Sequence, residues 1–381
     1  MNIKQQQFHN PEDLWSGLSN FNATDFDIHF IFADKLYFED EKLNEKIQSL
    51  FKNSLIMGCS TSGEIHGSSF RENSFSLTSI KFENTKIRKS TFIIQDSNDS
   101  FKAGQSIASN LKEDNLKHVF ILSEGINING SNLLQGVNSV LDRNVNVSGG
   151  LAGDNATFYK TYVADENNRF IPNCISAIGF YGDNFNSESS SYGGWDSFGI
   201  DRLVTKSIQN IVYEIDHKPA LDLYKSYLGD KSKDLPGAAM YFPLEMRENE
   251  YTEPLVRTIL GINEEDKSLT FAGNVPENSF VRLMKTNVNR VIEGANKSAR
   301  LLTDNLNSVP EFAILVSCVG RKIVLNQLTQ DEVEAVTENF DSTVAFSGFY
   351  SNGEISKMKF VDSCKLHNQT MTITLFSEKN S

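Results

Sequence analysis

Three short turns in the sequence carry a glycine followed at once by an acidic residue. They read GCSTSGE at residues 58–64, SGGLAGD at 148–154 and GFYSNGE at 348–354. Glycine adopts backbone torsions that other residues resist, and amides left free in such a turn hold an oxyanion or a carboxylate. A plain tight turn with a capping acid is the simpler interpretation of any one copy. The recurrence favours a duplicated structural unit over three separate binding sites.

Several polar residues of these turns are candidate ligand contacts. They are Cys59, Ser60, Thr61, Gly63, Glu64, Asp154 and Glu354. Cys59 follows a predicted strand, where a nucleophile can lie, and His66 is the nearest candidate base. A small buried thiol is the simpler interpretation. Glu64 and Glu354 form a carboxylate pair only if the two halves of the chain face each other.

Histidine and arginine supply the remaining candidate site residues. No two of the six histidines have the spacing of a metal site. His66 and His367 lie beside the glycine-rich and C-terminal motifs, so they are the histidines expected to touch a ligand. Arg257, in a predicted strand, pairs either with a ligand carboxylate or with a buried acid. For Arg321 a turn-stabilising role is expected.

Common enzyme motifs are missing from the sequence. It has no G-x-S-x-G, no Walker loop, no G-x-G-x-x-G and no H-E-x-x-H. The four cysteines lie far apart, without a C-x-x-C pair, which argues against a zinc site and a covalently attached haem. The common enzyme classes therefore have no support in the sequence, and we expect reduced thiols in the cytoplasm.

Composition excludes several classes of protein. The 381 residues suggest two domains, and apolar runs fall far short of the roughly 20 residues of a membrane helix. The N-terminal sequence has no signal-peptide pattern. A net charge of −13 without a basic run argues against nucleic acid and anionic membranes as partners.

Hydrophobic periodicity predicts strands and helices along the whole chain. Strands are expected at 27–34, 53–60, 75–82, 87–95, 119–122, 145–147, 157–163, 174–181, 203–207, 210–215, 255–261, 269–272, 280–284, 312–317, 322–325, 344–348 and 370–375. Helices are expected at 40–51, 101–111, 133–141, 219–228, 287–306 and 329–340. The small polar run at 187–194 is typical of a loop.

This order of elements predicts an α+β (mixed α/β) protein of two domains. Each domain has a mixed β-sheet packed with helices and contains internal β-α-β repeats. We place an N-terminal domain at 25–216 and a C-terminal domain at 217–376, because a boundary falls between about 187 and 216 and a clear helix then opens the second half.

Segments spread over nearly the whole chain resemble the FIST family, whose bacterial members pair an N-terminal and a C-terminal FIST domain. The segments lie at 58–65 (GCSTSGEI), 148–154, 218–229 (KPALDLYKSYLG), 242–244, 256–257, 269–276 (LTFAGNVP), 280–285, 318–321, 348–355 (GFYSNGEI) and 366–370 (LHNQT). The stretches 192–198, 252–262 and 366–371 resemble the haem-binding nitric oxide sensing proteins within this family.

The resemblance implies a sensor of a small ligand in signal transduction and not an enzyme. Within the haem-binding subgroup it implies haem b, nitric oxide as the signal, and a histidine kinase or cyclic-di-GMP enzyme as the regulated partner. His367, in a family-like motif, is the axial metal ligand expected first, and His66 the second. The alternative is a sensor for an amino acid or another small carboxylate, without haem, in which Arg257 pairs with the ligand.

Either ligand is expected in a cleft that draws on both halves of the chain. The cleft would bring together residues 59–64, Asp154, Arg257, Glu354 and His367, because turns at strand ends gather at one edge of a sheet.

Overall fold

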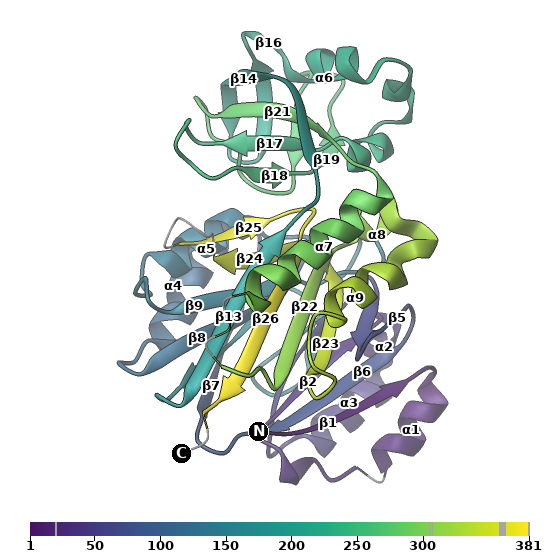
Figure 1. The fold of residues 1–381 in the computed structure, drawn as a ribbon, viewed down its shortest axis with the longest axis vertical. Coiled ribbons are helices and arrows are strands. Elements are labelled where there is room, and N and C mark those ends of the chain that lie inside the picture. The colour runs from purple at the N-terminus through teal and green to yellow at the C-terminus, as the bar shows by residue number, and fades with distance from the viewer. Residues whose placement is uncertain (20, 305, 307, 358–362, 380–381) are drawn as a thin grey trace.

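The computed structural model describes residues 1–19, 21–304, 306, 308–357 and 363–379. The protein is mixed α/β, as predicted from the sequence. Three six-stranded sheets form a body that holds both described chain ends, and an eight-stranded sheet forms a smaller unit on top of it (Figure 1).

The body is built from three copies of one β-α-β-β repeat. In each copy the first two strands are parallel and the third strand is antiparallel to the first. The strands are β2 (Ile28–Ala33), β3 (Leu55–Ser60) and β6 (Phe75–Lys81); β8 (Leu116–Ser123), β9 (Asn146–Leu151) and β12 (Cys174–Tyr181); β22 (Phe312–Cys318), β23 (Ala345–Ser351) and β26 (Met371–Glu378).

Helices lie on the outer faces of the three sheets, and one further strand extends each sheet beyond the third strand of its repeat. These strands are β1 (Asn2–Phe8), β7 (Lys86–Ile93) and β13 (Phe185–Tyr192). The helices are α1 (Pro11–Ser19), α2 (Leu36–Glu39), α3 (Glu41–Leu50), α4 (Ser100–Leu111), α5 (Gly130–Asn138), α7 (Val288–Thr303), α8 (Val319–Leu325) and α9 (Thr329–Thr337).

Each repeat gives a short hairpin to the sheet of another repeat. The hairpin β4 (Glu64–His66)–β5 (Ser69–Arg71) pairs with β23, β10 (Val163–Ala164)–β11 (Phe170–Ile171) pairs with β3, and β24 (Gly353–Lys357)–β25 (Cys364–His367) pairs with β9. The first repeat gives its hairpin to the third, the second to the first, and the third to the second. The N-terminal and C-terminal parts of the chain therefore share sheets.

The inner faces of the three sheets meet in an aromatic core. The ring of Phe30 lies 5.9 Å from that of Phe120 and 5.5 Å from that of Phe312, and the rings of Phe32 and Phe349 stack at 4.7 Å. All five rings are buried. Because side chains fill its centre, the body does not enclose a ligand chamber there.

The smaller unit is inserted between β13 and α7 of the third repeat. Its elements are β14 (Asp196–Ile208), β15 (Ile211–Ile215), β16 (Lys218–Pro219), α6 (Ala220–Leu228), β17 (Leu244–Arg247), β18 (Leu255–Arg257), β19 (Ile259–Ile262), β20 (Leu269–Phe271) and β21 (Phe280–Lys285). We call it the inserted domain. The boundary predicted at 216/217 lies between β15 and β16, inside its sheet.

Three local predictions were wrong. Residues 187–194, predicted as a loop, belong largely to β13, in which every residue pairs with β26; this pairing overrides the weak strand preference of serine and asparagine. Residues 322–325, predicted as a strand, lie in α8, because a short apolar run fits a buried helix equally well. Of 157–163, only Val163 lies in a strand. The predicted helix 287–306 corresponds to α7, and residue 305 lies outside the described residues.

Register shows that the middle glycine-acid motif is displaced by one residue. Gly58, Gly149 and Gly348 face Ile31, Ile121 and Leu315 on the parallel neighbour strands. A Cβ atom on these glycines would lie 2.5, 1.8 and 2.0 Å from the facing carbonyl oxygens. The equivalent of Gly58 is thus Gly149 and not Ser148, which the sequence pattern had suggested.

Candidate functional site

The ends of the three parallel strand pairs meet in a ring of backbone hydrogen bonds. The Ser62 amide donates to the Tyr350 carbonyl at 2.8 Å, the Gly153 amide to Ser60 at 2.9 Å, and the Asn352 amide to Leu151 at 3.2 Å. Amides that the sequence offered as an oxyanion site are therefore occupied by partners from another repeat. The Gly63 amide is also occupied, because it donates to Thr61 Oγ1 of its own turn at 3.2 Å.

Glu64 and Glu354 occupy equivalent positions in the exchanged hairpins. Each is fully buried. Glu64 accepts hydrogen bonds from the Ser74 amide and hydroxyl at 2.9 and 2.7 Å and one from the Thr61 hydroxyl. Burial raises the pKa of Glu64 to about 7.

Glu354 repeats this arrangement with Ser351 and Thr370. It accepts from the Ser351 hydroxyl at 2.8 Å and from the Thr370 amide and hydroxyl at 3.1 and 2.9 Å. Burial raises the pKa of Glu354 to about 8. The two glutamates lie in different sheets, so the structure does not bring them together as a carboxylate pair.

Asp154 does not share this position. In the hairpin from the second repeat, the equivalent position is held by Val163, which faces Cys59. In the other two hairpins Glu64 faces Phe349 and Glu354 faces Gly150. The Asp154 carboxylate instead accepts from the backbone amides of residues 158, 159 and 160 at 2.9, 2.7 and 3.1 Å. It holds a tight turn of the chain, where a strand had been predicted.

Cys59 and Ser60 are enclosed at the end of β3. Cys59 is fully buried, and burial together with Glu64 raises the pKa of its thiol well above the ordinary value. Ser60 Oγ donates to the Gly153 carbonyl at 2.8 Å and accepts from the Tyr162 amide at 2.9 Å. His66 Nδ1 is engaged with Ser76 Oγ at 3.0 Å, and burial lowers its pKa. The raised pKa makes the Cys59 thiol a poor nucleophile.

A second group of predicted residues meets where the inserted domain rests on the body. Glu354 pairs with His367 across β24 and β25, and Arg257 in β18 reaches the next residue, Leu366. Among the described residues no hydrogen bond or ion pair joins this group to Cys59, Ser60, Thr61, Gly63, Glu64 or Asp154. The structure therefore separates the predicted residues into two clusters.

Arg257 is held almost entirely by backbone carbonyls. It is 3% exposed; its Nε donates to Asn274 O at 3.1 Å and its Nη1 to Val256 O at 3.2 Å and Leu366 O at 3.0 Å. Its Nη2 has no hydrogen-bond partner, and no carboxylate pairs with it, among the described residues. Burial lowers the Arg257 pKa to about 10, so the guanidinium stays charged at neutral pH.

A small pocket lies beside this guanidinium, at the junction of the inserted domain and the body. Its volume is about 60 Å³. We call it the junction pocket. Its lining residues are Ser131, Leu134, Gln135 and Asn138 of α5, Met246, Glu248, Leu255, Arg257, Asn274 and Pro276 of the inserted domain, and Cys364, Lys365 and Leu366 of β25.

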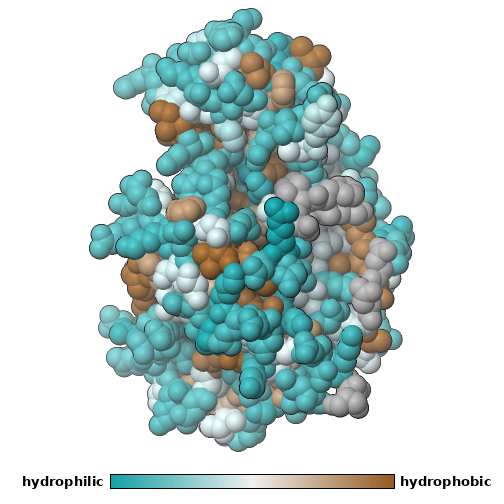
Figure 2. Space-filling model, turned by 90° about the vertical axis from the view of Figure 1, so that its left-hand side faces the viewer, coloured by the Kyte–Doolittle hydropathy of each residue, from teal (hydrophilic) through white to brown (hydrophobic). Residues whose placement is uncertain are grey.

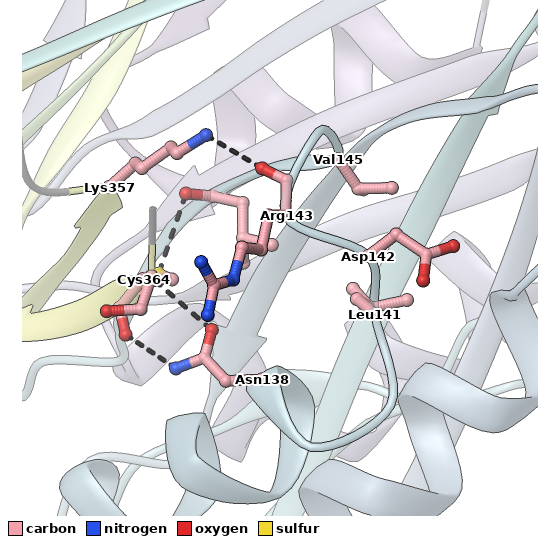
Figure 3. Close-up of a pocket in the computed structure, with 9 residues that line it drawn as sticks. Asn138, Leu141, Asp142, Arg143, Val145, Lys357 and Cys364 are labelled. Carbon is pink, nitrogen blue, oxygen red and sulfur yellow. Dashed lines mark hydrogen bonds between the residues drawn. The ribbon is translucent and has the colours of Figure 1, made fainter. Parts of the chain in front are cut away.

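A second pocket of about 190 Å³ shares Asn138 and Cys364 with the junction pocket. Figure 3 shows the Asn138 amide paired with the backbone of Cys364, donating to its carbonyl at 2.8 Å and accepting from its amide at 3.2 Å. The guanidinium of Arg143 points toward this pair (Figure 3). The Asn138 side chain thus caps the edge of β25 and lines both pockets.

Three asparagines that the sequence analysis did not single out fasten the inserted domain beside the pocket. Asn274 accepts from Asn129 Nδ2 and donates to Asn132 Oδ1, both at 2.8 Å, and its amide donates to Ser131 Oγ at 3.0 Å. Asn129 also caps the N-terminus of α5. Asn274 lies in the family-like segment 269–276, whereas the sequence signal for Asn129 and Asn132 was their place just before a predicted helix. Their pairing depends on the tertiary structure.

His367 was the predicted axial ligand for haem. It is largely buried, its Nε2 lies 3.3 Å from Ser356 O, and burial together with Arg257 lowers its pKa to about 4. A neutral imidazole is the form that binds iron. The junction pocket on the adjacent segment is, however, far smaller than the roughly 300–1,000 Å³ of ordinary ligand pockets. A pocket of this size does not hold a porphyrin.

The fold is a body of three sheets with a further domain inserted into it. Residues 27–218 match the FIST N domain and residues 220–357 match the FIST C domain. The chain belongs to the FIST family. FIST domains are generally small-ligand sensing domains of signalling proteins.

Two further comparisons assign no activity to this chain. The chain is 24% identical over 249 residues to the uncharacterized protein MJ1623 of Methanocaldococcus jannaschii. The aligned region covers 60% of this chain and 46% of that protein. It thus spans less than half the length of that relative. A crystal structure of cyanuric acid hydrolase from A. caulinodans aligns with a TM-score of 0.37 at 5% identity, over 100% of this chain and 99% of that one.

The described residues contain neither a membrane-spanning helix nor a metal-binding cluster. Within the described ranges, every helix is too short or too polar to cross a bilayer. The same part of the chain has no group of three or more histidine, cysteine, aspartate or glutamate side chains placed to hold a metal ion.

Proposed function

We propose that this protein senses a small carboxylate, such as an amino acid, which binds at Arg257 in the junction pocket. The observation that carries the proposal is a buried guanidinium with a free Nη2 and no carboxylate partner among the described residues. A buried cation is costly unless it is paired. A ligand carboxylate would supply that partner through a charge-assisted hydrogen bond.

Charge and size narrow the ligand class. Of the charged groups lining the pocket, Lys365 forms an ion pair with Glu248 at 3.2 Å, whereas Arg257 forms none among the described residues. One water needs about 10–15 Å³, so a 60 Å³ pocket has room for a ligand of only a few heavy atoms. Acetate, lactate, glycine and alanine are of this size. The apolar wall of Leu134, Met246 and Leu255 favours a ligand with a methyl group over a fully polar one.

The position of the pocket suits a sensor. It is lined by residues of both the inserted domain and the body, so a bound ligand touches both. A ligand can shift a two-state equilibrium only through contacts that differ between the states, and a ligand at a junction has such contacts. We propose that the output passes to a separate signalling protein in the cytoplasm, such as a histidine kinase or a cyclic-di-GMP enzyme. In this role the chain is not an enzyme.

The haem hypothesis has one observation in its favour, the neutral His367 imidazole. If haem b binds, iron chemistry would come from the cofactor, and His367 or His66 would have to hold it. Both imidazoles already contact neighbouring residues. The carboxylate hypothesis needs no rearrangement of this kind, and we favour it.

A ligand panel tests the two hypotheses together. Thermal melting of the purified chain is followed with acetate, L-lactate, glycine and L-alanine, and absorbance spectra are recorded after addition of haemin. We expect a raised Tm with at least one carboxylate and no Soret shift that depends on His367. A Soret band that disappears in His367→Ala and responds to nitric oxide, with no carboxylate effect, would select the haem hypothesis.

A further inference from the structure

We propose that helix α8 couples the junction pocket to the outer helices of the third repeat, and that Arg321 is the residue through which this coupling passes. The proposal rests on the proposed function for its physiological input, because the ligand would act at Arg257. It concerns how that site is connected to a surface that a signalling partner can reach.

The chain of contacts begins at the pocket. Arg257 holds Leu366 O of β25 at 3.0 Å, and three residues later the chain turns into β26 at Gln369. The Gln369 carbonyl accepts from Trp195 Nε1 at 3.1 Å, and its side chain donates to Met240 O of the inserted domain at 3.2 Å. A displacement of Arg257 therefore acts directly on the turn that carries Gln369.

Arg321 binds that turn and the two crossings between the body and the inserted domain. The outgoing crossing leads from β13 into the inserted domain, and the returning crossing leads from it into α7. It is completely buried. Its Nη1 donates to Gln369 O at 3.1 Å and to Gly193 O in the outgoing crossing, and its Nη2 donates to Val291 O, near the start of α7, at 2.7 Å. One rigid side chain thus ties together three segments that are distant in sequence.

Glu332 extends the connection to α9. Arg321 Nε donates to Glu332 Oε1 at 2.7 Å, while Glu332 Oε2 accepts from Ser317 Oγ at 2.9 Å and Tyr350 Oη at 2.6 Å. Both charged side chains are inaccessible to solvent. Because an unpaired buried charge is strongly unfavourable, Arg321 and Glu332 are expected to move together.

The residues on either side of Arg321 in α8 also contact other parts of the body. Gly320 packs so closely on Gln369 that a Cβ there would lie 2.5 Å from the side-chain amide nitrogen. On its other side, Lys322 Nζ donates to Ser62 O at 2.7 Å and Asn155 Oδ1 at 3.2 Å, which belong to the first and second repeats. A shift of α8 therefore changes contacts in all three repeats.

Close packing also fixes the two crossings on α7. Gly194 has a φ of +84°, and a Cβ on it would lie 2.1 Å from Arg290 O; one on Gly294 would lie 2.7 Å from Gly193 O. The outgoing chain therefore rests directly on the backbone of α7. Figure 1 shows α7, α8 and α9 side by side below the inserted domain, on one outer face of the body.

Hydrogen exchange measured on the full chain without any ligand tests the coupling. Asn274→Ala removes the side-chain contacts to Asn129 and Asn132 next to Arg257 and so disturbs the pocket side of the junction. We expect several-fold faster exchange in α9 (329–337) as well as locally. Asn263→Ala, in a loop of the same domain where Asn263 only caps Glu265, is the control and should leave α9 unchanged.

The decisive comparison repeats Asn274→Ala in an Arg321→Lys background. Lysine keeps the charge beside Glu332 but cannot bind all three carbonyl segments, so the effect of Asn274→Ala on α9 should disappear. An α9 response that is absent in the first experiment, or equal in both backgrounds, overturns the proposal. If Arg321→Lys does not fold, Tyr350→Phe removes one of the two hydrogen bonds to Glu332 Oε2 at nearly constant shape. It should weaken the same response, and an undiminished response overturns the proposal. Ligand binding is not used here, so the proposed function stands or fails separately.

Discussion

Arg257 donates a hydrogen bond of 3.0 Å to the carbonyl oxygen of Leu366. An arginine at the edge of the inserted domain's sheet thereby caps the edge strand β25 of a body sheet. Asn138 caps the same edge at Cys364. The two sheet edges do not join into one sheet, because side chains satisfy the backbone groups between them. The junction pocket lies in this space.

Removal of the Arg257 guanidinium should abolish carboxylate recognition. A lost charge-assisted hydrogen bond costs about 1.5–3 kcal/mol, so Arg257→Ala should weaken binding of the best carboxylate of the panel by roughly 10- to 150-fold. Isothermal titration calorimetry measures this. Arg202→Ala, which breaks a half-exposed pair with Asp216 on the same domain, should bind like the wild type. Equal affinities in the two variants would place the ligand elsewhere.

The buried Glu354 should make stability depend on pH. Its folded pKa of about 8 lies above the ordinary value near 4.3, so its contribution is fully present below about pH 4.3 and is lost as pH rises toward 8. The wild type should therefore lose unfolding free energy between about pH 5 and 8, and Glu354→Gln should lose less over this window. Urea denaturation at a series of pH values measures the slopes. Parallel curves for the two proteins would contradict the prediction.

A methyl group at Gly149 should prevent correct folding. The Cβ would lie 1.8 Å from Ile121 O, and the φ of +145° is unfavourable for any other residue. We expect Gly149→Ala to lose at least ~3 kcal/mol of unfolding free energy or to be insoluble. Gly237→Ala is the matched control, because nothing lies within 4 Å of its Cβ position. Circular dichroism during urea unfolding distinguishes the two variants.

The cysteines should be chemically inert in the native protein. All four are buried, and burial raises the pKa of each thiol. A thiol-specific reagent should modify none of them at neutral pH before unfolding and all four afterwards. Rapid modification of Cys59 in the folded chain would instead revive a nucleophilic role for it, and Cys59→Ser would then identify the reactive group.

Hydrophobic patterning was enough to predict the main elements of the three repeats. Runs such as 28–33 are buried on both faces, and an apolar stripe on one face marks a helix such as α3, where Leu43 and Ile47 are buried. These are local properties of the chain, and the family resemblance rests on similarly local motifs. The sequence could not predict β13, whose serines form a strand only because β26 lies beside them.

The sequence by itself determined the mixed α/β class, the repeated strand–helix–strand unit and the tight glycines at the strand ends. Only the tertiary structure decided which strand each glycine approaches, and it showed that the middle motif is displaced by one residue. It also decided the hairpin exchange, the insertion between β13 and α7, and the meeting of Arg257, Glu354 and His367. Pattern and propensity act over a few residues, whereas these relationships arise from long-range packing and from buried polar groups that need a partner.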